Sequence, residues 1–508
     1  MPFPMEHTSP PAEVDVVVIG GGPAGSAIGR LLAEWGHSVL ILTRPTDPTR
    51  GLAESLPPSS RNLLSAIGAL EVVDGAGFCR TTGNTVWWGS RQGRVEHFRA
   101  PDGAFGFQVL RPELDRLLLE SAGNAGARVR TDATVRHVRL ENDVALVEYE
   151  DAGRPVTSAC RFALDCSGRS GLIARQGFRR HEPYYGMQAL IGVWDREGRW
   201  DLPDETHTVV ETFEDGWAWS VPISRTARHL VAMVDGATTH MSRGPTLEST
   251  YRAELAKASQ LDALRAGAVL NRVWACDASL YSSTAYGGPN FLLVGDAGSC
   301  IDPLSSFGVK KALASAWVGA VAVHTAIRHP DRLEVALEFF SAREREMYLS
   351  NLRRSREYAR EAHARHPHAF WASRASIEID PWSEEPDEGT IVREPDVQAA
   401  FQMLKDSPAL ALVLASQRQL EKRALIRGRE IVLEDAVSLP GVHGALRFFA
   451  GVDLLMLGEM ATRFRQVPDL FEAYCRSEPP VPLPRFLLGL SLLVAKGVLT
   501  MGGRVLPQ

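Results

Sequence analysis

The chain has 508 residues, of which 45% are hydrophobic and 23% are charged, and its net charge is −6. This length predicts two or three domains, and this composition is typical of globular proteins, which excludes a disordered, collagen-like or multi-span membrane chain. The net negative charge argues against a positively charged surface that would bind nucleic acid. Only six of the 55 basic residues are lysines, and none lies before Lys257. A mechanism that needs a lysine amine in the first half is therefore excluded.

Residues 14–19 form a short β-branched run that ends in glycines, which predicts a buried parallel strand. Residues 26–34 have the pattern of a helix and residues 38–42 that of a second strand, so the chain begins with a βαβ unit. Alternating segments between residues 187 and 234 predict a β-sheet. Residues 291–294 predict another buried strand, followed by a helix over residues 309–327.

The C-terminal region predicts a separate module. Residues 380–396 are rich in acids and prolines, which is typical of a linker. Beyond them we expect an α-rich module with one hairpin near residues 425–437. Its three expected helices, which resemble those of a winged-helix-like domain, cover residues 452–460, 468–475 and 483–499. The region is not basic, so a protein-binding or capping role is favoured over DNA.

The sequence contains no motif that we interpret as a metal site or as a targeting signal. The six cysteines form no pair or cluster with zinc-ligand spacing, so we expect no metal site. A dispersed cysteine set favours the reducing cytoplasm. The first 13 residues do not resemble a signal peptide. The apolar stretch 486–499 is interrupted by Lys496 and is too short to span a bilayer, so we expect a buried helix and no membrane span.

A glycine motif follows the first strand directly. Gly20, Gly22 and Gly25 form GxGxxG, with Pro23 and Ala24 inside it, at the point where the helix begins. Gly20 permits a tight turn, Gly22 lets a pyrophosphate approach the backbone, and Gly25 lets helix and strand pack closely. The helix N-terminus attracts the anion. We therefore predict a dinucleotide site here.

The end of the second strand carries Thr43 and Arg44 where an acidic residue is usual. An acid would bind the ribose hydroxyls, whereas an arginine can serve a 2′-phosphate, so NADP has to be considered. The alternative is that Thr43 makes a weaker ribose bond and that Arg44 faces solvent or the pyrophosphate.

A second signature decides between these cofactors. Asp296 follows the strand at residues 291–294, and Gly308 and Val309 open the next helix. Such an Asp can bind a ribityl hydroxyl, although an N-cap role is an alternative. The helix N-terminus can face the flavin edge on which negative charge collects during reduction. Two such motifs about 270 residues apart favour an extended, noncovalently bound FAD.

Together with the segments 111–115 (RPELD) and 164–169 (LDCSGR), these motifs resemble the FAD-dependent aromatic hydroxylase superfamily. Residues 54–57 (ESLP) and 217–222 (WAWSVP) resemble its flavin-dependent tryptophan halogenase-like branch, and the resemblance covers residues 14–370. It adds four residues to the predicted cofactor contacts, namely Arg50, Glu54, Ser55 and Arg111. It implies an α/β fold with a Rossmann-like FAD-binding domain (residues 1–185 and 275–375), an inserted β-sheet substrate domain (186–274), a linker (376–396) and the C-terminal module (397–508).

Two departures argue against halogenation. Halogenases of this branch use a lysine in the N-terminal half to capture hypohalous acid, and the corresponding segment 77–90 has none. Arg80 cannot replace it, because its guanidinium stays protonated. A small hydroxyl residue is usual before the helix glycine, where this chain has Phe307. The resemblance then implies a monooxygenase that hydroxylates an electron-rich ring through a flavin C4a-hydroperoxide.

The string DPLSSFGVKK at residues 302–311 and the C-terminal module are similar to maturases that hydroxylate a peptidyl tryptophan during tryptophylquinone cofactor biogenesis. This similarity implies an aromatic substrate within a protein or peptide, and other maturation enzymes as partners. The chain shows no second nucleotide motif, so we expect NAD(P)H to bind transiently or a separate flavin reductase to supply electrons.

The catalytic and substrate residues follow from the same segments. Trp217 and Trp219 share one face of a strand, where they wall a substrate pocket or pack in the core. Of the adjacent Trp87 and Trp88, we expect Trp88 to line the pocket. The predicted catalytic residues lie at the turn before the second helix and are Pro303, Phe307 and Lys310. Lys310 is expected to stabilise reduced flavin, or else to be solvated, while Lys311 points elsewhere.

Three other activities stay open at this point. They are a halogenase, a hydroxylase of a small aromatic molecule, and a flavin reductase of isoprenoid type. A halogenase would give a bromide-dependent product mass. A reductase would need a long apolar tunnel and would transfer hydride without consuming O₂.

Overall fold

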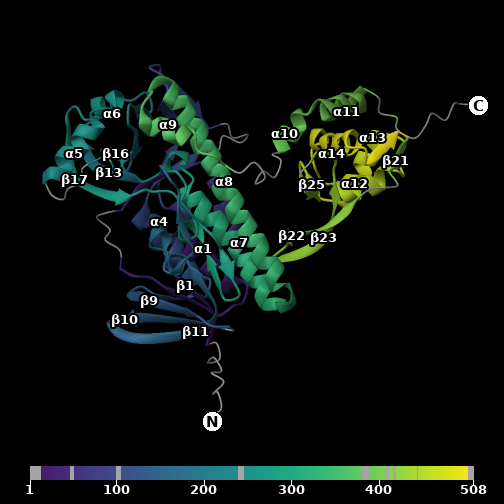
Figure 1. The fold of residues 1–508 in the computed structure, drawn as a ribbon, viewed down its shortest axis with the longest axis horizontal. Helices are drawn as coiled ribbons and strands as arrows, with labels where there is room; N and C mark the ends of the chain where they lie inside the picture. Colours follow the sequence, from purple (N-terminus) through teal and green to yellow (C-terminus); the bar gives the residue numbers. More distant parts are fainter. Residues whose placement is uncertain are drawn as a thin grey trace, which may run out of the picture. The chain divides into compact units, whose positions relative to one another are not determined.

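The structure is a computed structural model that describes residues 13–45, 51–98, 105–142, 144–237, 239, 245–379, 388–406, 409, 411–415, 419–442 and 444–501. The chain divides into two compact units, Met1–Ile379 and Asp380–Gln508. The first unit contains two large sheets, and the second is a small mixed α/β unit (Figure 1). The predicted α/β class is confirmed.

The first sheet holds the predicted βαβ start. Its central strand β1 (Val14–Ile19) pairs in parallel with β2 and β11, because residues 16–18 are apolar and fully buried on both faces. The strand order is β19 (Gly287–Gly288), β20 (Phe291–Leu293), β11 (Arg154–Asp165), β1, β2 (Val39–Leu42) and β8 (Arg128–Arg130), and β11 also pairs with the antiparallel β10 (Ala145–Asp151), which pairs with β9 (Ala133–Leu140).

Four of the described helices pack together in this Rossmann-like part. Helix α1 (Pro23–Glu34) contacts both α4 (Arg111–Asn124) and α7 (Gly308–Arg328), and the three lie together beside β1 in Figure 1. The long helix α8 (Leu333–Arg365) packs on α7. Both α1 and α4 carry a proline in the first turn, which suits a helix start because that N–H has no helical partner.

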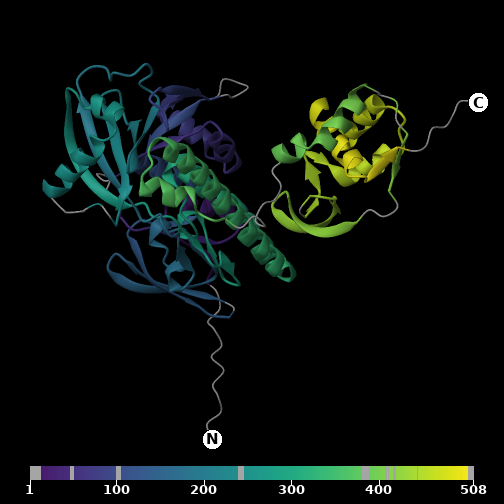
Figure 2. The ribbon, with the colours of Figure 1, turned by 45° about the horizontal axis from the view of Figure 1, so that its top comes forward.

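The second sheet is the predicted substrate sheet, but it is wider than the insertion expected at residues 186–274. Strand β5 pairs in parallel with β14, so a segment from the first hundred residues extends it (Figure 2). The expected domain was a continuous range of residues, and such a range cannot include a strand that pairs with it from elsewhere in the chain. Its order is β17 (Ala268–Asp277), β13 (Met187–Arg196), β16 (Ala227–Asp235), β15 (Gly216–Pro222), β14 (Thr208–Phe213), β5 (Gly83–Trp87) and β6 (Arg94–His97).

The two faces of this sheet bury different clusters. One face carries Trp217 and Ile191 and packs toward α8 and α9 (Ala369–Ala375), and the other packs against α5 (Pro245–Leu255) and α6 (Ser259–Leu264). The remaining described elements of the unit are β3 (Ala53–Leu56), β7 (Gly106–Leu110), β4 (Cys79–Thr81), β12 (Arg179–His181), β18 (Tyr281–Ser283), α2 (Ser60–Ala66), α3 (Leu70–Gly75) and the 3-10 turns η2 (Gly168–Ser170), η3 (Ala174–Gln176), η4 (Gly295–Ala297), η5 (Pro303–Ser305) and η6 (Pro330–Arg332).

The second unit contains the predicted hairpin and the three predicted helices. Helix α10 lies inside the segment expected as a linker, because Ile391 is buried in the core of this unit. The winged-helix-like label itself stays a prediction. The elements are α10 (Glu388–Arg393), α11 (Pro395–Asp406), β21 (Leu412–Leu414), β22 (Leu420–Arg427), β23 (Glu430–Ser438), β24 (Ala445–Leu446), β25 (Phe448–Phe449), β26 (Val452–Asp453), α12 (Leu454–Ala461), α13 (Val467–Ser477), α14 (Leu483–Ala495) and β27 (Leu499–Met501).

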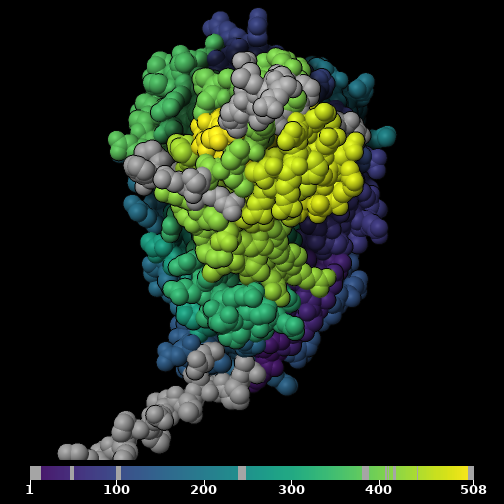
Figure 3. All heavy atoms as spheres, turned by 90° about the vertical axis from the view of Figure 1, so that its right-hand side faces the viewer, coloured from purple at the N-terminus to yellow at the C-terminus, as the bar shows by residue number. Residues whose placement is uncertain are grey.

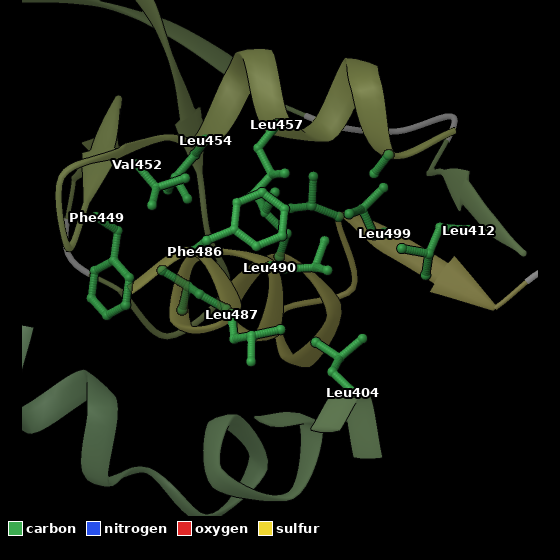
Figure 4. Packing of buried hydrophobic residues seen from close by; sticks show 14 of the residues in the cluster. Leu404, Leu412, Phe449, Val452, Leu454, Leu457, Phe486, Leu487, Leu490 and Leu499 are labelled. Carbon is green, nitrogen blue, oxygen red and sulfur yellow. The ribbon is translucent and has the colours of Figure 1, made fainter. Parts of the chain in front are cut away.

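The core of the second unit is apolar and centred on α14. Phe486, Leu487 and Leu490 from α14 belong to one buried cluster with Val452 and Leu454 (Figure 4). The buried helix expected over residues 486–499 is present as α14 but ends at Ala495, and Leu499 begins β27. Figure 3 turns the surface of this unit, lime to yellow, toward the viewer. Among the described residues no helix is both long and apolar enough to cross a membrane.

Candidate active site

The glycine turn between β1 and α1 is shaped by close backbone contacts. Gly20 has a φ of +108°, and a Cβ added there would lie 2.5 Å from the carbonyl oxygen of Cys166. A Cβ on Gly25 would lie 1.8 Å from the carbonyl oxygen of Gly20. At Gly22 the nearest atom to an added Cβ is Arg111 Nη2, at 3.8 Å. Gly20 and Gly25 thus serve packing, whereas Gly22 leaves the helix N-terminus open to a ligand.

This turn borders a cavity of about 340 Å³. The cavity brings together residues from both predicted motifs and from the segments between them. Gly25 is not among its lining residues, Ser55 lines a neighbouring cavity instead, and Arg50 lies outside the described residues. The predicted cofactor residues that line it are Gly20, Gly22, Pro23, Ala24, Thr43, Arg44, Glu54, Arg111, Asp296, Gly308 and Val309.

Asp296 offers a free acceptor to this cavity. Its Oδ1 is buried and has no hydrogen-bond partner among the described residues. The nearest cation is Lys311, whose Nζ lies 3.6 Å from Oδ1. That ammonium is occupied by the carbonyl oxygens of Gly295, at 2.9 Å, and Ser299. A buried carboxylate oxygen without a donor is the partner that a ribityl hydroxyl requires.

Arg111 and two carboxylates form a polar cluster at the cavity wall. Arg111 donates from Nη1 to Glu54 Oε1 at 3.2 Å and from Nε to Asp115 Oδ1 at 3.0 Å. Burial raises the pKa of Glu54, and the Arg111 charge opposes that shift. The sequence pattern RPELD places Asp115 four residues after Arg111, and this i, i+4 spacing on a helix was the available signal that the carboxylate holds the arginine in place.

A second cavity, of about 320 Å³, joins the first at Glu54, Arg111, Gly168, Asp296 and Gly308, which line both. One face of the second sheet forms its apolar wall. The side chains that this face contributes include Ala189, Ile191, Val210, Trp217, Trp219, Val221, His229 and Val231. A largely apolar space next to a polar dinucleotide cleft suits an aromatic ring beside a flavin.

Trp217 and Trp219 share one face of β15, as their i, i+2 spacing predicted, and both line this second cavity. Their ring centroids lie 4.9 Å apart. Trp88 does not line it. Its side chain is 2% exposed, packs behind Trp217 and donates from Nε1 to the carbonyl oxygen of Tyr358 at 3.0 Å. The structure therefore places Trp88 in the core, because the end of β5 faces α8 and α9.

The predicted catalytic residues are separated. Pro303 lines the second cavity, whereas Phe307 and Lys310 are not among its lining residues. Lys310 Nζ lies 4.6 Å from the centroid of the Phe307 ring, and burial together with the nearby Arg354 lowers its pKa. Lys311 is the lysine at the Gly295–Asp296 turn. Lys311 and Ser315 are four residues apart and therefore share a helix face. Ser315 Oγ accepts a hydrogen bond from the Gly295 N–H at 2.8 Å. This i, i+4 spacing was the sequence signal that could have identified Lys311.

His229 is a cavity residue that the sequence reading missed. It lies on β16 and is 2% exposed. Its Nδ1 accepts a hydrogen bond from the backbone N–H of Ala53 at 3.1 Å. Burial lowers the pKa of this imidazole to about 4. The ring is therefore neutral near pH 7.

Residues 13–320 match the family described as FAD binding domain. The chain belongs to the FAD binding domain family. The cavity fits that cofactor, since the glycine turn leaves room for a pyrophosphate and Asp296 has a free acceptor. FAD is thus the cofactor.

Two curated relatives are halogenases. The chain is 30% identical over 339 residues to a tryptophan 2-halogenase from Chondromyces crocatus, a match that covers 65% of each protein. It is 29% identical over 350 residues to a 1H-pyrrole-2-carbonyl-[peptidyl-carrier protein] chlorinase from Pseudomonas fluorescens, covering 63% of this chain and 77% of the relative. The chain thus spans just under two thirds of the first relative's length.

Solved structures show the same fold. The flavin-dependent halogenase CmlS has a TM-score of 0.75 at 23% identity, with 96% of each chain covered. The myxobacterial chondrochloren halogenase CndH has a TM-score of 0.67 at 26% identity, with 78% of this chain and 90% of CndH covered. The peptidyl tryptophan dihydroxylase QhpG has a TM-score of 0.67 at 22% identity, covering 95% and 99%. The predicted resemblance to the halogenase-like branch of the aromatic hydroxylases is confirmed.

Proposed function

We propose that this chain is an FAD-dependent monooxygenase that hydroxylates an aromatic ring, and that the ring is a tryptophan side chain within a peptide. The observation that carries the proposal is the apolar second cavity, which joins the FAD cleft and has no lysine among its described lining residues. FAD supplies the oxygen chemistry when it is bound and reduced. The protein then has to hold the ring and exclude water.

Lys310 and Lys311 lie shortly after the cavity residue Gly308 in the sequence, and the side chains of both make contacts with other groups. Lys311 donates to the carbonyl oxygens of Gly295 and Ser299, and Lys310 lies over the Phe307 ring. Neither is free to capture a hypohalous acid in the second cavity. This arrangement favours hydroxylation over a halogen transfer through a lysine.

The peptide substrate is supported by the extent of the match to QhpG, which is described as essential for tryptophylquinone cofactor biogenesis and of which 99% is covered. CmlS is covered equally well, so the second unit does not by itself identify the substrate. We also propose a cytoplasmic location, because all six cysteines are free. Other maturation enzymes would then be partners.

The experiment is incubation of reduced holoenzyme with a tryptophan-containing peptide under ¹⁸O₂, followed by mass spectrometry. We expect one or more oxygen-18 atoms in the tryptophan. Free tryptophan and a phenylalanine peptide serve as the comparison substrates. Incorporation into free tryptophan alone would indicate a small-molecule hydroxylase, and reduction without O₂ consumption would indicate a flavin reductase.

Halogenation is the second candidate, because the Chondromyces crocatus relative is a tryptophan 2-halogenase at 30% identity. The same incubation is therefore repeated with bromide. A bromide-dependent mass increase in the indole would replace our proposal with this one. If bromide leaves the product mass unchanged, hydroxylation stands.

A further inference from the structure

His229 stands out among the residues of the second cavity. It is the histidine in a wall whose other side chains are mostly apolar, such as Ile191, Val221 and Val231. On β16 it pairs with Val221 of β15, and its ring meets Trp274 edge-on at 5.6 Å. The imidazole is thus held firmly, with only 2% of the residue exposed.

The proton on this imidazole is placed by one backbone contact. The Ala53 N–H can only donate, so the Nδ1 that receives it at 3.1 Å carries no proton. Burial lowers the pKa of the ring to about 4, and a neutral imidazole carries one proton. That proton is therefore on Nε2.

Nε2 has no hydrogen-bond partner among the residues that the structure describes. Nε2 is not one of the fully buried unpaired atoms of the described residues, so it is open to the cavity. An N–H that faces a largely apolar cavity gains a favourable contact when a ligand brings an acceptor. The residues that pair with His229 on the neighbouring strands are Val193 and Val221, whose side chains have no acceptor to offer. The donor is therefore available to whatever occupies the cavity.

We propose that His229 is a specificity-determining residue whose Nε2–H binds an acceptor oxygen of the aromatic substrate. The proposal deepens the proposed function and rests on it only in taking an aromatic ring as the ligand. An indole nitrogen is a donor and cannot bind this N–H. For a peptidyl tryptophan the acceptor is therefore a main-chain carbonyl oxygen, and for a phenol it is the ring oxygen.

The test measures binding to oxidised holoenzyme by the change in flavin absorbance, so it needs no turnover. Two pairs of probes differ in the acceptor: N-acetyltryptophanamide against 3-methylindole, and p-cresol against toluene. We expect the oxygen-bearing member of at least one pair to bind about tenfold more tightly, as one hydrogen bond to a buried donor implies. The variant His229→Phe should lose this preference, and His229→Gln, which retains an amide donor, should recover part of it.

His207 provides the matched control, since it is equally buried but bonds to Thr82 and Thr85 and lies outside the cavity lining. His207→Phe should keep the probe preference. If His229→Phe changes FAD retention or the flavin reduction potential but not the probe preference, the donor serves the flavin and the proposal is wrong. Probes that bind equally, or do not bind at all, also contradict it. A halogenated product in the ¹⁸O₂ experiment would overturn the proposed chemistry without affecting this result.

Discussion

The ammonium of Lys311 lies 3.6 Å from the carboxylate of Asp296 and donates to the carbonyl oxygen of Gly295 at 2.9 Å. One buried lysine thus holds the turn that presents the predicted ribityl contact. Its side chain is 1% exposed, so the charge is compensated by protein groups rather than by water. The stability of this turn and the affinity for FAD should therefore depend on the same residue.

Lys311→Met should destabilise the protein by about 3 kcal/mol, because it leaves buried acceptors and a carboxylate without their cation. It should also weaken FAD retention, since the Gly295–Asp296 turn loses its support. Thermal unfolding of apoprotein and holoprotein measures the first effect, and fluorescence titration with FAD measures the second. Lys310→Met is the matched control and should change stability by no more than about 0.5 kcal/mol. Equal effects of the two variants would contradict the assignment.

Asp296→Ala should raise the dissociation constant for FAD roughly 10- to 100-fold, the loss expected for a hydrogen bond to a charged group. The reason is that Oδ1 has no protein donor among the described residues and is left for the cofactor. Titration of apoprotein with FAD gives the constant. Asp331→Ala, in the exposed turn η6, should bind FAD like the parent. If Asp296→Ala retains FAD as tightly as the parent, the ribityl contact lies elsewhere.

The local motifs of this site were predictable from sequence, because each depends on residues that are neighbours in the chain. The glycine turn follows from GxGxxG after a β-branched strand, and the shared face of Trp217 and Trp219 follows from strand alternation. Both arrangements are set by backbone geometry alone. The structure therefore places these residues where the sequence predicted them.

The non-local parts were not predictable in the same way. Trp88 lies in the core because β5 joins a sheet whose other strands come from later in the chain. Adjacent helix residues point about 100° apart, so only one of Lys310 and Lys311 can face the Gly295 turn, and packing decides which. The tautomer of His229 depends on Ala53, which is 176 residues away. Such contacts are fixed only by the tertiary fold.

The glycines of the first turn should respond differently to alanine. Gly25→Ala should destabilise the protein by about 3 kcal/mol, because its Cβ would overlap the carbonyl oxygen of Gly20 at 1.8 Å. Gly22→Ala meets no protein atom closer than 3.8 Å, so it should fold normally and lose FAD affinity, since the methyl group occupies the approach of the pyrophosphate. Circular dichroism melting and FAD titration separate the two effects. A Gly22→Ala variant that binds FAD normally would show that the pyrophosphate does not approach there.

His229 should make stability depend on pH. Its pKa is about 4 in the folded protein, against the ordinary histidine value of 6.5 that applies to the unfolded chain. A pKa that is lowered on folding means that the unfolded state binds the proton more readily, so its contribution to stability is complete above pH 6.5 and is lost as the pH falls from 6.5 toward 4. The lost contribution amounts to about 3 kcal/mol. Urea unfolding at pH 7.5, 6 and 5 measures the dependence.

His229→Phe should lack this component, because phenylalanine does not titrate. Other buried histidines such as His207 also have a lowered pKa and contribute to the slope of the parent. The informative quantity is therefore the free energy of unfolding of the parent minus that of the variant. It should decrease from pH 7.5 to pH 5, because the parent loses more stability than the variant over this range. A difference that stays constant over this range would mean that His229 is not held neutral on folding, and the fixed Nε2–H donor would lose its support.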